Sequence, residues 1–195
     1  MKTLVLYWSY TGNTEAIAKT IYNTVKEEGY PCDLFKIGSE SDVDWFDYNL
    51  ISVGSPVYEW LPPKNVMKYL QDRYHYYRDE KGSVKPCSPK LKGKFAVVFC
   101  TYGGPHTGIH EAIPAIKYIE QSFEHLGFSI LEPIAVVGGF KVEKLDGRLG
   151  WTKELWEKMN KLGKEGDITG RPNENDLNDV KNKTIGIINT IKGLM

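Results

Sequence analysis

Apolar and amphipathic stretches alternate along most of the chain. Five runs of strand length are apolar, aromatic or β-branched and predict strands at residues 2–8, 31–37, 49–53, 95–100 and within 128–137. Other runs repeat apolar residues at helical spacing, as Ile17, Ile21 and Val25 do. They predict helices at residues 14–28, 43–46, 64–70 and beyond, 109–126, 153–162 and 175–191. Apolar strands that alternate with helices indicate a parallel sheet covered on both faces, a three-layer, doubly wound α/β fold.

Glycine and proline residues mark the ends of these elements. We expect Gly29 and Gly127 to end helices, Gly54 to open a Gly-Ser-Pro break after the third strand, and Pro133 to interrupt the fifth. Two stretches exceed the alternating pattern, a tyrosine-rich basic insertion at 71–94 and an irregular one at 138–150. Because the length suits one domain and no repeat divides it, residues 1–195 are expected to form a single domain.

Composition narrows the class of protein. The 195 residues include 25 basic and 25 acidic side chains, so the formal net charge is zero and gives no general reason to expect nucleic acid or membrane binding. The three cysteines are far apart, which argues against a disulfide framework, a metal site or an iron–sulfur cluster. No run approaches the roughly 20 apolar residues of a membrane span, and the N-terminal run is too short for a signal peptide. These features predict a cytoplasmic protein without a metal.

The most informative motif follows the first strand. Ser9-Tyr10-Thr11-Gly12-Asn13-Thr14 joins that strand to the first helix, and it contains three hydroxyls and a glycine but no lysine or arginine. A loop at a helix N-terminus directs backbone N–H groups and a positive dipole end at its ligand, so this loop suits a phosphate monoester held by hydrogen bonds. It lacks the Walker and dinucleotide glycine patterns. The alternative is that these residues only cap the helix.

The stretch from Tyr7 to Glu15 resembles the FMN-phosphate loop of flavodoxins. That resemblance implies a five-stranded parallel sheet of order 2-1-3-4-5, in which the loops after strands 1, 3 and 4 share one mouth. The second of these loops, Gly-Ser-Pro-Val-Tyr at 54–58, resembles the second flavin loop of flavodoxins and quinone reductases. Residues 101–108 look like the third, and 171–177 resemble the entry to the last helix of flavodoxin-like NAD(P)H:quinone oxidoreductases.

The resemblance implies FMN as the cofactor and gives each loop a role. The cofactor-binding residues expected are Ser9, Tyr10, Thr11, Gly12, Asn13, Thr14, Pro56, Val57, Tyr58, Glu59, Trp60, Leu61, Thr101, Tyr102, Gly103, Gly104, His106, Thr107 and Gly108. Tyr58, Trp60 and Tyr102 are candidates to stack on the flavin ring, although Tyr58 and Trp60 could equally anchor their loop on the core. His106 resembles a histidine beside the flavin of quinone reductases. No acid–base or nucleophilic pair is evident, so no catalytic residue is assigned.

Two functions remain open. A flavodoxin carries electrons between redox partner proteins, and the close match of the phosphate loop favours this function. An FMN-dependent NAD(P)H:quinone oxidoreductase acts on nicotinamide and quinone substrates and is often a homo-oligomer; neutral charge and His106 favour it. The second loop also lacks the small residue that lets a peptide flip toward reduced flavin in many flavodoxins, since Tyr58-Glu59-Trp60 contains no glycine. An FMN-less binding module is disfavoured by the intact phosphate loop.

Overall fold

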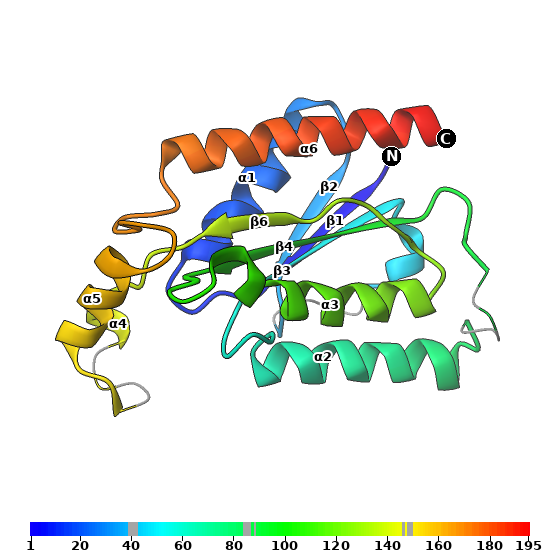
Figure 1. Cartoon of the computed structure of the whole chain (residues 1–195). Coiled ribbons are helices and arrows are strands. Elements are labelled where there is room, and N and C mark those ends of the chain that lie inside the picture. The colour runs from blue at the N-terminus through cyan, green and yellow to red at the C-terminus, as the bar shows by residue number, and fades with distance from the viewer. Residues whose placement is uncertain (39–42, 84–86, 88, 146, 148–149) are drawn as a thin grey trace.

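The protein is a three-layer α/β structure, seen here in a computed structural model (Figure 1). The structure describes residues 1–38, 43–83, 87, 89–145, 147 and 150–195. Parts of both predicted insertions therefore lie outside the described residues, namely residues 84–86 and 88 of the first and residues 146, 148 and 149 of the second.

The central layer is a parallel sheet of order β2-β1-β3-β4-β5, which confirms the predicted topology. Its strands are β1 (Thr3–Tyr7), β2 (Cys32–Lys36), β3 (Leu50–Pro56), β4 (Phe95–Tyr102), β5 (Ser129–Ile130) and β6 (Ile134–Val137). The short strands β5 and β6 both pair with β4, one against each half of it, so together they fill the fifth position. Every residue of β1 and β4 is buried, because helices cover both faces of the sheet.

Two helices cover each face of the sheet. The larger helices are α1 (Asn13–Glu27), α2 (Lys64–His75), α3 (Ile113–His125), α5 (Lys153–Leu162) and α6 (Glu174–Leu194). One core cluster joins α1 and α6 to the sheet through Ile17, Val180 and Ile188, and the other joins α2 and α3 through Leu70 and Phe123. Figure 1 shows α5 and the short α4 (Val142–Leu145) at the end of the sheet where the strands finish.

Three predicted boundaries are wrong. The third strand does not break at Gly54 but continues to Pro56, because the missing Cβ of Gly54 leaves space for the ring of Phe99 on the neighbouring strand. The helix expected from 109 begins as a short turn, η3 (Gly108–Glu111), and α3 starts only at Ile113. The short helix expected at 43–46 forms instead as the 3-10 helix η1 (Trp45–Asp47), where the Asp44 carboxylate accepts a hydrogen bond from the Phe46 N–H.

The tyrosine-rich insertion is partly an extension of the core rather than a solvated surface. Helix α2 continues to His75 and is followed by the turn η2 (Tyr76–Glu80). The Tyr77 ring is fully buried and packs on Trp45, and its hydroxyl accepts a hydrogen bond from the Trp45 N–H at 2.6 Å. The Arg73 guanidinium lies over the ring of Tyr76 and donates to the Tyr77 hydroxyl. Aromatic packing therefore fixes this part of the insertion on the α2–α3 face.

Candidate functional site

The phosphate-loop candidate lies between the end of β1 and the start of α1. Gly12 is the N-cap of α1, with a left-handed backbone (φ 105°) that favours glycine, and no side chain caps the helix. The Ser9 hydroxyl instead accepts a hydrogen bond from the Gly12 N–H at 3.1 Å. The first-turn N–H groups of a helix have no partner within the helix, so this end of α1 is open to an acceptor from outside.

Thr14 connects the first loop with the third. Its hydroxyl lies 2.7 Å from the hydroxyl of Thr101, and both side chains are buried. Each hydroxyl has a single proton to donate, so one of them donates to the other and the second proton remains for another acceptor. The pair therefore couples β4 to the start of α1 and still offers one donor.

The second loop forms a tight hairpin after β3. The N–H of Tyr58 donates to the carbonyl of Leu61 at 2.9 Å, and the reverse bond measures 3.0 Å. The two residues between them, Glu59 (φ 48°) and Trp60 (φ 68°), both have left-handed backbones, as in a type I′ turn. Non-glycine residues pay roughly 1–2 kcal/mol each for this conformation. The loop is thus held in a strained turn, with Trp60 60% exposed at its tip.

The third loop is shaped by glycines at two close approaches. A Cβ on Gly103 would lie 2.3 Å from the Phe140 ring, and one on Gly104 would lie 2.8 Å from the backbone of Gly108. Beyond them, the N–H groups of His106 and Thr107 donate to the Glu111 carboxylate at 2.7 and 2.8 Å. These contacts turn the loop back onto η3, where the His106 side chain is exposed.

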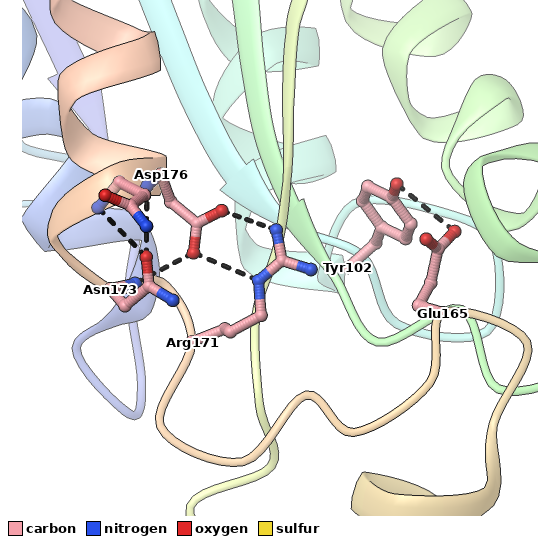
Figure 2. A network of polar contacts seen from close by, with 6 residues as sticks. Tyr102, Glu165, Arg171, Asn173 and Asp176 are labelled. Carbon is pink, nitrogen blue, oxygen red and sulfur yellow. Dashed lines mark hydrogen bonds and ion pairs between the residues drawn. The ribbon is translucent and has the colours of Figure 1, made fainter.

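A polar network stands behind the third loop (Figure 2). The Tyr102 hydroxyl lies 3.4 Å from a carboxylate oxygen of Glu165, and burial together with the charge of Glu165 raises the pKa of Tyr102 to about 12. Tyr102 therefore stays protonated and donates to Glu165. Arg171 forms an ion pair with Asp176, and the Asp176 carboxylate also accepts from the Asn173 N–H at 2.8 Å at the start of α6.

The segment between β6 and α6 packs against the phosphate loop. The Asn13 side-chain amide donates to the Gly139 carbonyl at 2.8 Å in a buried hydrogen bond. The Asn160 side chain of α5 bonds both backbone groups of Phe140, at 2.7 and 2.9 Å. Farther along, the Lys164 N–H donates to the Pro105 carbonyl at 2.9 Å. This segment therefore contacts the first and third loops together.

The three loops and this segment line a half-open cavity of about 60 Å³. Eleven of the predicted residues line it, namely Ser9, Tyr10, Thr11, Asn13, Thr14, Pro56, Val57, Tyr58, Thr101, Tyr102 and Gly103. The other predicted residues do not line it, and these are Gly12, Glu59, Trp60, Leu61, Gly104, His106, Thr107 and Gly108. Four lining residues were missed by the sequence reasoning, Gly138, Gly139, Phe140 and Leu145. Gly138 and Gly139 could have been found from the sequence, because they form a Gly-Gly pair directly after an apolar strand.

Outside the cavity, the described residues include free cysteines, one of which is buried in the sheet. Cys100 is buried within β4, and burial raises the pKa of its thiol to about 12. Among the described residues, no three histidine, cysteine or acidic side chains gather where they could hold a metal ion. Within the same residues, no helix combines the length and apolar character needed to cross a membrane.

Comparison with known proteins agrees with this architecture. Streptococcus pneumoniae TIGR4 flavodoxin has a similar fold, with a TM-score of 0.62 at 15% identity over 97% of this chain and 99% of its own. Bacillus cereus flavodoxin 2, in its oxidised form, gives a TM-score of 0.62 at 17% identity with the same coverage of both chains. At such low identity these similarities concern the fold alone.

Two curated relatives match parts of the chain in sequence. The flavodoxin-like domain-containing protein BilS of Clostridioides difficile is 36% identical over 72 residues, which cover 37% of this chain and only 40% of BilS. NAD(P)H dehydrogenase (quinone) 3 of Rhizobium meliloti is 25% identical over 167 residues, covering 75% of this chain and 73% of the relative. A family model described as a flavodoxin domain matches residues 4–107, more than half of the 195 residues. The chain therefore belongs to the flavodoxin-domain family.

Proposed function

We propose that the chain binds one FMN non-covalently at this cavity and carries electrons through it. The observation that supports FMN is the start of α1. Hydroxyl residues stand on both sides of Gly12, yet none of them caps the helix, which argues against the purely capping function of this loop. An uncapped helix N-terminus beside hydroxyl donors suits the terminal phosphate monoester of FMN.

The volume of the cavity supports binding of one end of this cofactor. Pockets that enclose a whole small ligand usually measure about 300–1,000 Å³, so a cavity of about 60 Å³ suits the phosphate end alone. The flavin ring then belongs at the open rim, near Tyr58, Trp60 and Tyr102. Bound FMN supplies the electron chemistry, and the residues of the chain bind it, orient it and tune its potential.

Titration calorimetry with FMN, FAD and riboflavin tests the cofactor. We expect one FMN per chain and weaker binding of both other flavins, because riboflavin lacks the phosphate and FAD extends beyond it. Thr11→Ala should weaken FMN binding by about 1.5–3 kcal/mol if its hydroxyl bonds the phosphate. Thr190→Ala, which alters an exposed hydroxyl on α6, is the matched control. FAD binding as tight as FMN would overturn the proposal.

Fluorescence tests the position of the ring. Stacking on an aromatic side chain should quench flavin emission on binding, and alanine variants of Tyr58, Trp60 and Tyr102 should restore part of it. Each variant should lose little affinity, since an aromatic pair contributes about 0.5–1.5 kcal/mol beyond burial. Equal quenching in the parent and all three variants would show that the ring lies elsewhere.

Electron carriage between redox partner proteins in the cytoplasm is the function we favour, because the phosphate loop is the part most similar to flavodoxins. The quinone dehydrogenase relative from Rhizobium supports a second candidate, an FMN-dependent NAD(P)H:quinone oxidoreductase, which would fit a homo-oligomer. A steady-state assay with NADH or NADPH and a benzoquinone separates the two. Turnover within about 1–1000 per second, the ordinary enzyme range, would favour the oxidoreductase. Negligible turnover would favour the carrier, provided that reductive titration shows the bound flavin being reduced in two separate one-electron steps.

A further inference from the structure

A lysine distant in sequence reaches the phosphate loop. The loop itself contains no cation, but the Nζ of Lys144 on α4 lies 3.4 Å from the carbonyl oxygen of Thr11. The two residues are 133 positions apart. This contact brings a positive charge to a loop whose own sequence offers only hydroxyls and N–H groups.

The position of Lys144 is set by packing on both sides of it. Val142 and Leu145, on the same short helix, are buried and form a small core with Trp156 of α5. Leu145 also lines the cavity, directly after Lys144 in the chain. The buried bond from Asn13 to Gly139 fixes the start of this segment against the phosphate loop. The lysine is therefore carried by a packed element, although its own side chain is exposed.

The charges near the loop leave Lys144 suited to an anion. Glu15 in the first turn of α1 forms an ion pair with Lys19 at 2.6 Å, which offsets its negative charge. A lysine ammonium has three donors, and the long contact with the Thr11 carbonyl uses one of them. The other two can meet an acceptor bound in the loop. A phosphate monoester dianion is an acceptor of the right charge.

We propose that Lys144 is a phosphate-binding residue of the FMN site, a cation supplied by the segment between β6 and α6. This inference rests on the proposed FMN site and adds to it a specificity for the phosphorylated flavin. Such a contact depends on charge, so FMN binding should weaken with ionic strength more steeply than riboflavin binding does.

The test compares the FMN and riboflavin affinities of the parent, Lys144→Gln and Lys144→Arg by calorimetry at two salt concentrations. We expect Lys144→Gln to weaken FMN about fivefold, as for a partly exposed ion pair, and to leave riboflavin unchanged. Lys144→Gln should also reduce the salt dependence of FMN binding. Lys144→Arg should keep both the FMN affinity and the salt dependence of the parent. Lys141→Gln removes the same charge from an exposed position three residues earlier and is the matched control.

The outcomes separate this inference from the proposed function. If the parent does not prefer FMN to riboflavin, the phosphate site itself is refuted. If the parent prefers FMN and Lys144→Gln keeps that preference within twofold, only the role of Lys144 is refuted. An equal loss in Lys141→Gln would also refute it, because the effect would then come from general charge. Inorganic phosphate gives a second measurement, since it should compete with FMN more weakly in Lys144→Gln than in the parent.

Discussion

Replacing Gly54 with alanine should destabilise the sheet at the end that carries the site. The added Cβ would lie 1.9, 2.0 and 2.6 Å from three ring carbons of Phe99, whereas carbon atoms normally approach to about 3.5–4.0 Å. Phe99 is fully buried and is the register partner of Gly54 on β4, so the ring has no solvent to move into.

Overpacking of this kind costs about 1–3 kcal/mol. For a chain of this length, each kcal/mol lowers the melting temperature by about 2–4 °C, so the variant should melt roughly 2–12 °C below the parent. Thermal unfolding followed by circular dichroism measures the difference. Gly186→Ala is a matched control, because its added Cβ has no atom within 4 Å. Alanine is more favourable than glycine at an exposed position inside a helix, so this variant should not be destabilised.

A second substitution tests whether the contact with the Phe99 ring causes the loss of stability. Phe99→Leu shortens the side chain that the new methyl group would strike, so the double variant Gly54→Ala/Phe99→Leu should be more stable than the sum of the single effects predicts. The coupling free energy should be at least about 1 kcal/mol, within the range found for residues in contact. A Gly54→Ala variant that melts within a degree of the parent, or strictly additive effects, would refute the packing argument.

Three further predictions concern the loops and the start of α6. Trp60→Gly should raise the free energy of unfolding in urea by about 0.5–1 kcal/mol, since glycine relieves the left-handed backbone at φ 68° and offsets part of that gain through its entropy; a decrease would show that the turn is unstrained. The Arg171 guanidinium holds the pKa of Asp176 below its usual range. The ion pair therefore contributes fully to the free energy of unfolding above about pH 3.9, and this contribution is lost as the pH falls through the lower folded pKa. Asp176→Asn should cost about 1.5–3 kcal/mol near neutral pH and less as the pH falls below about 3.9, as unfolding titrations at neutral and acidic pH would measure. Thr14→Val and Thr101→Val should each cost about 1–3 kcal/mol by leaving a buried hydroxyl unpaired, and the double variant should cost less than their sum in thermal unfolding.

Local pattern was sufficient to predict the order of the elements along the chain and a parallel sheet, whereas the order of the strands in that sheet was implied by the resemblance to flavodoxins. The predicted helix at 153–162 coincides with α5 (Lys153–Leu162), where Thr152 supplies a side-chain cap to the Leu155 N–H, and such a cap is readable from sequence. The break predicted at Gly54 was wrong because glycine has two uses. It can end a strand, or it can make space for a neighbouring ring, and only the partner strand reveals which use applies.

The loops of the candidate site were predictable because each directly follows a strand. The segment after β6 was not predicted as part of the site. The Gly-Gly pair after that strand marks where the segment begins, but its role depends on contacts between residues far apart in the chain. Asn13 is expected from the sequence to bind the cofactor, yet its side-chain amide donates to the Gly139 carbonyl, 126 positions away. Lys144 reads as one of many surface lysines, and only the fold brings it to Thr11.

The buried bond between Asn13 and Gly139 has a consequence for how the protein acquires its site during folding. The cavity is lined by residues near the beginning of the chain and by residues after β6. These two parts of the lining come together only once β4 has paired with β6. Contacts this distant in sequence are costly in loop entropy and tend to form late. A flavin that binds only the completed cavity would add its binding free energy to the whole fold rather than to one loop. The rate at which flavin fluorescence is quenched would then report the last step of refolding. The helices would appear earlier, in the far-UV circular dichroism signal.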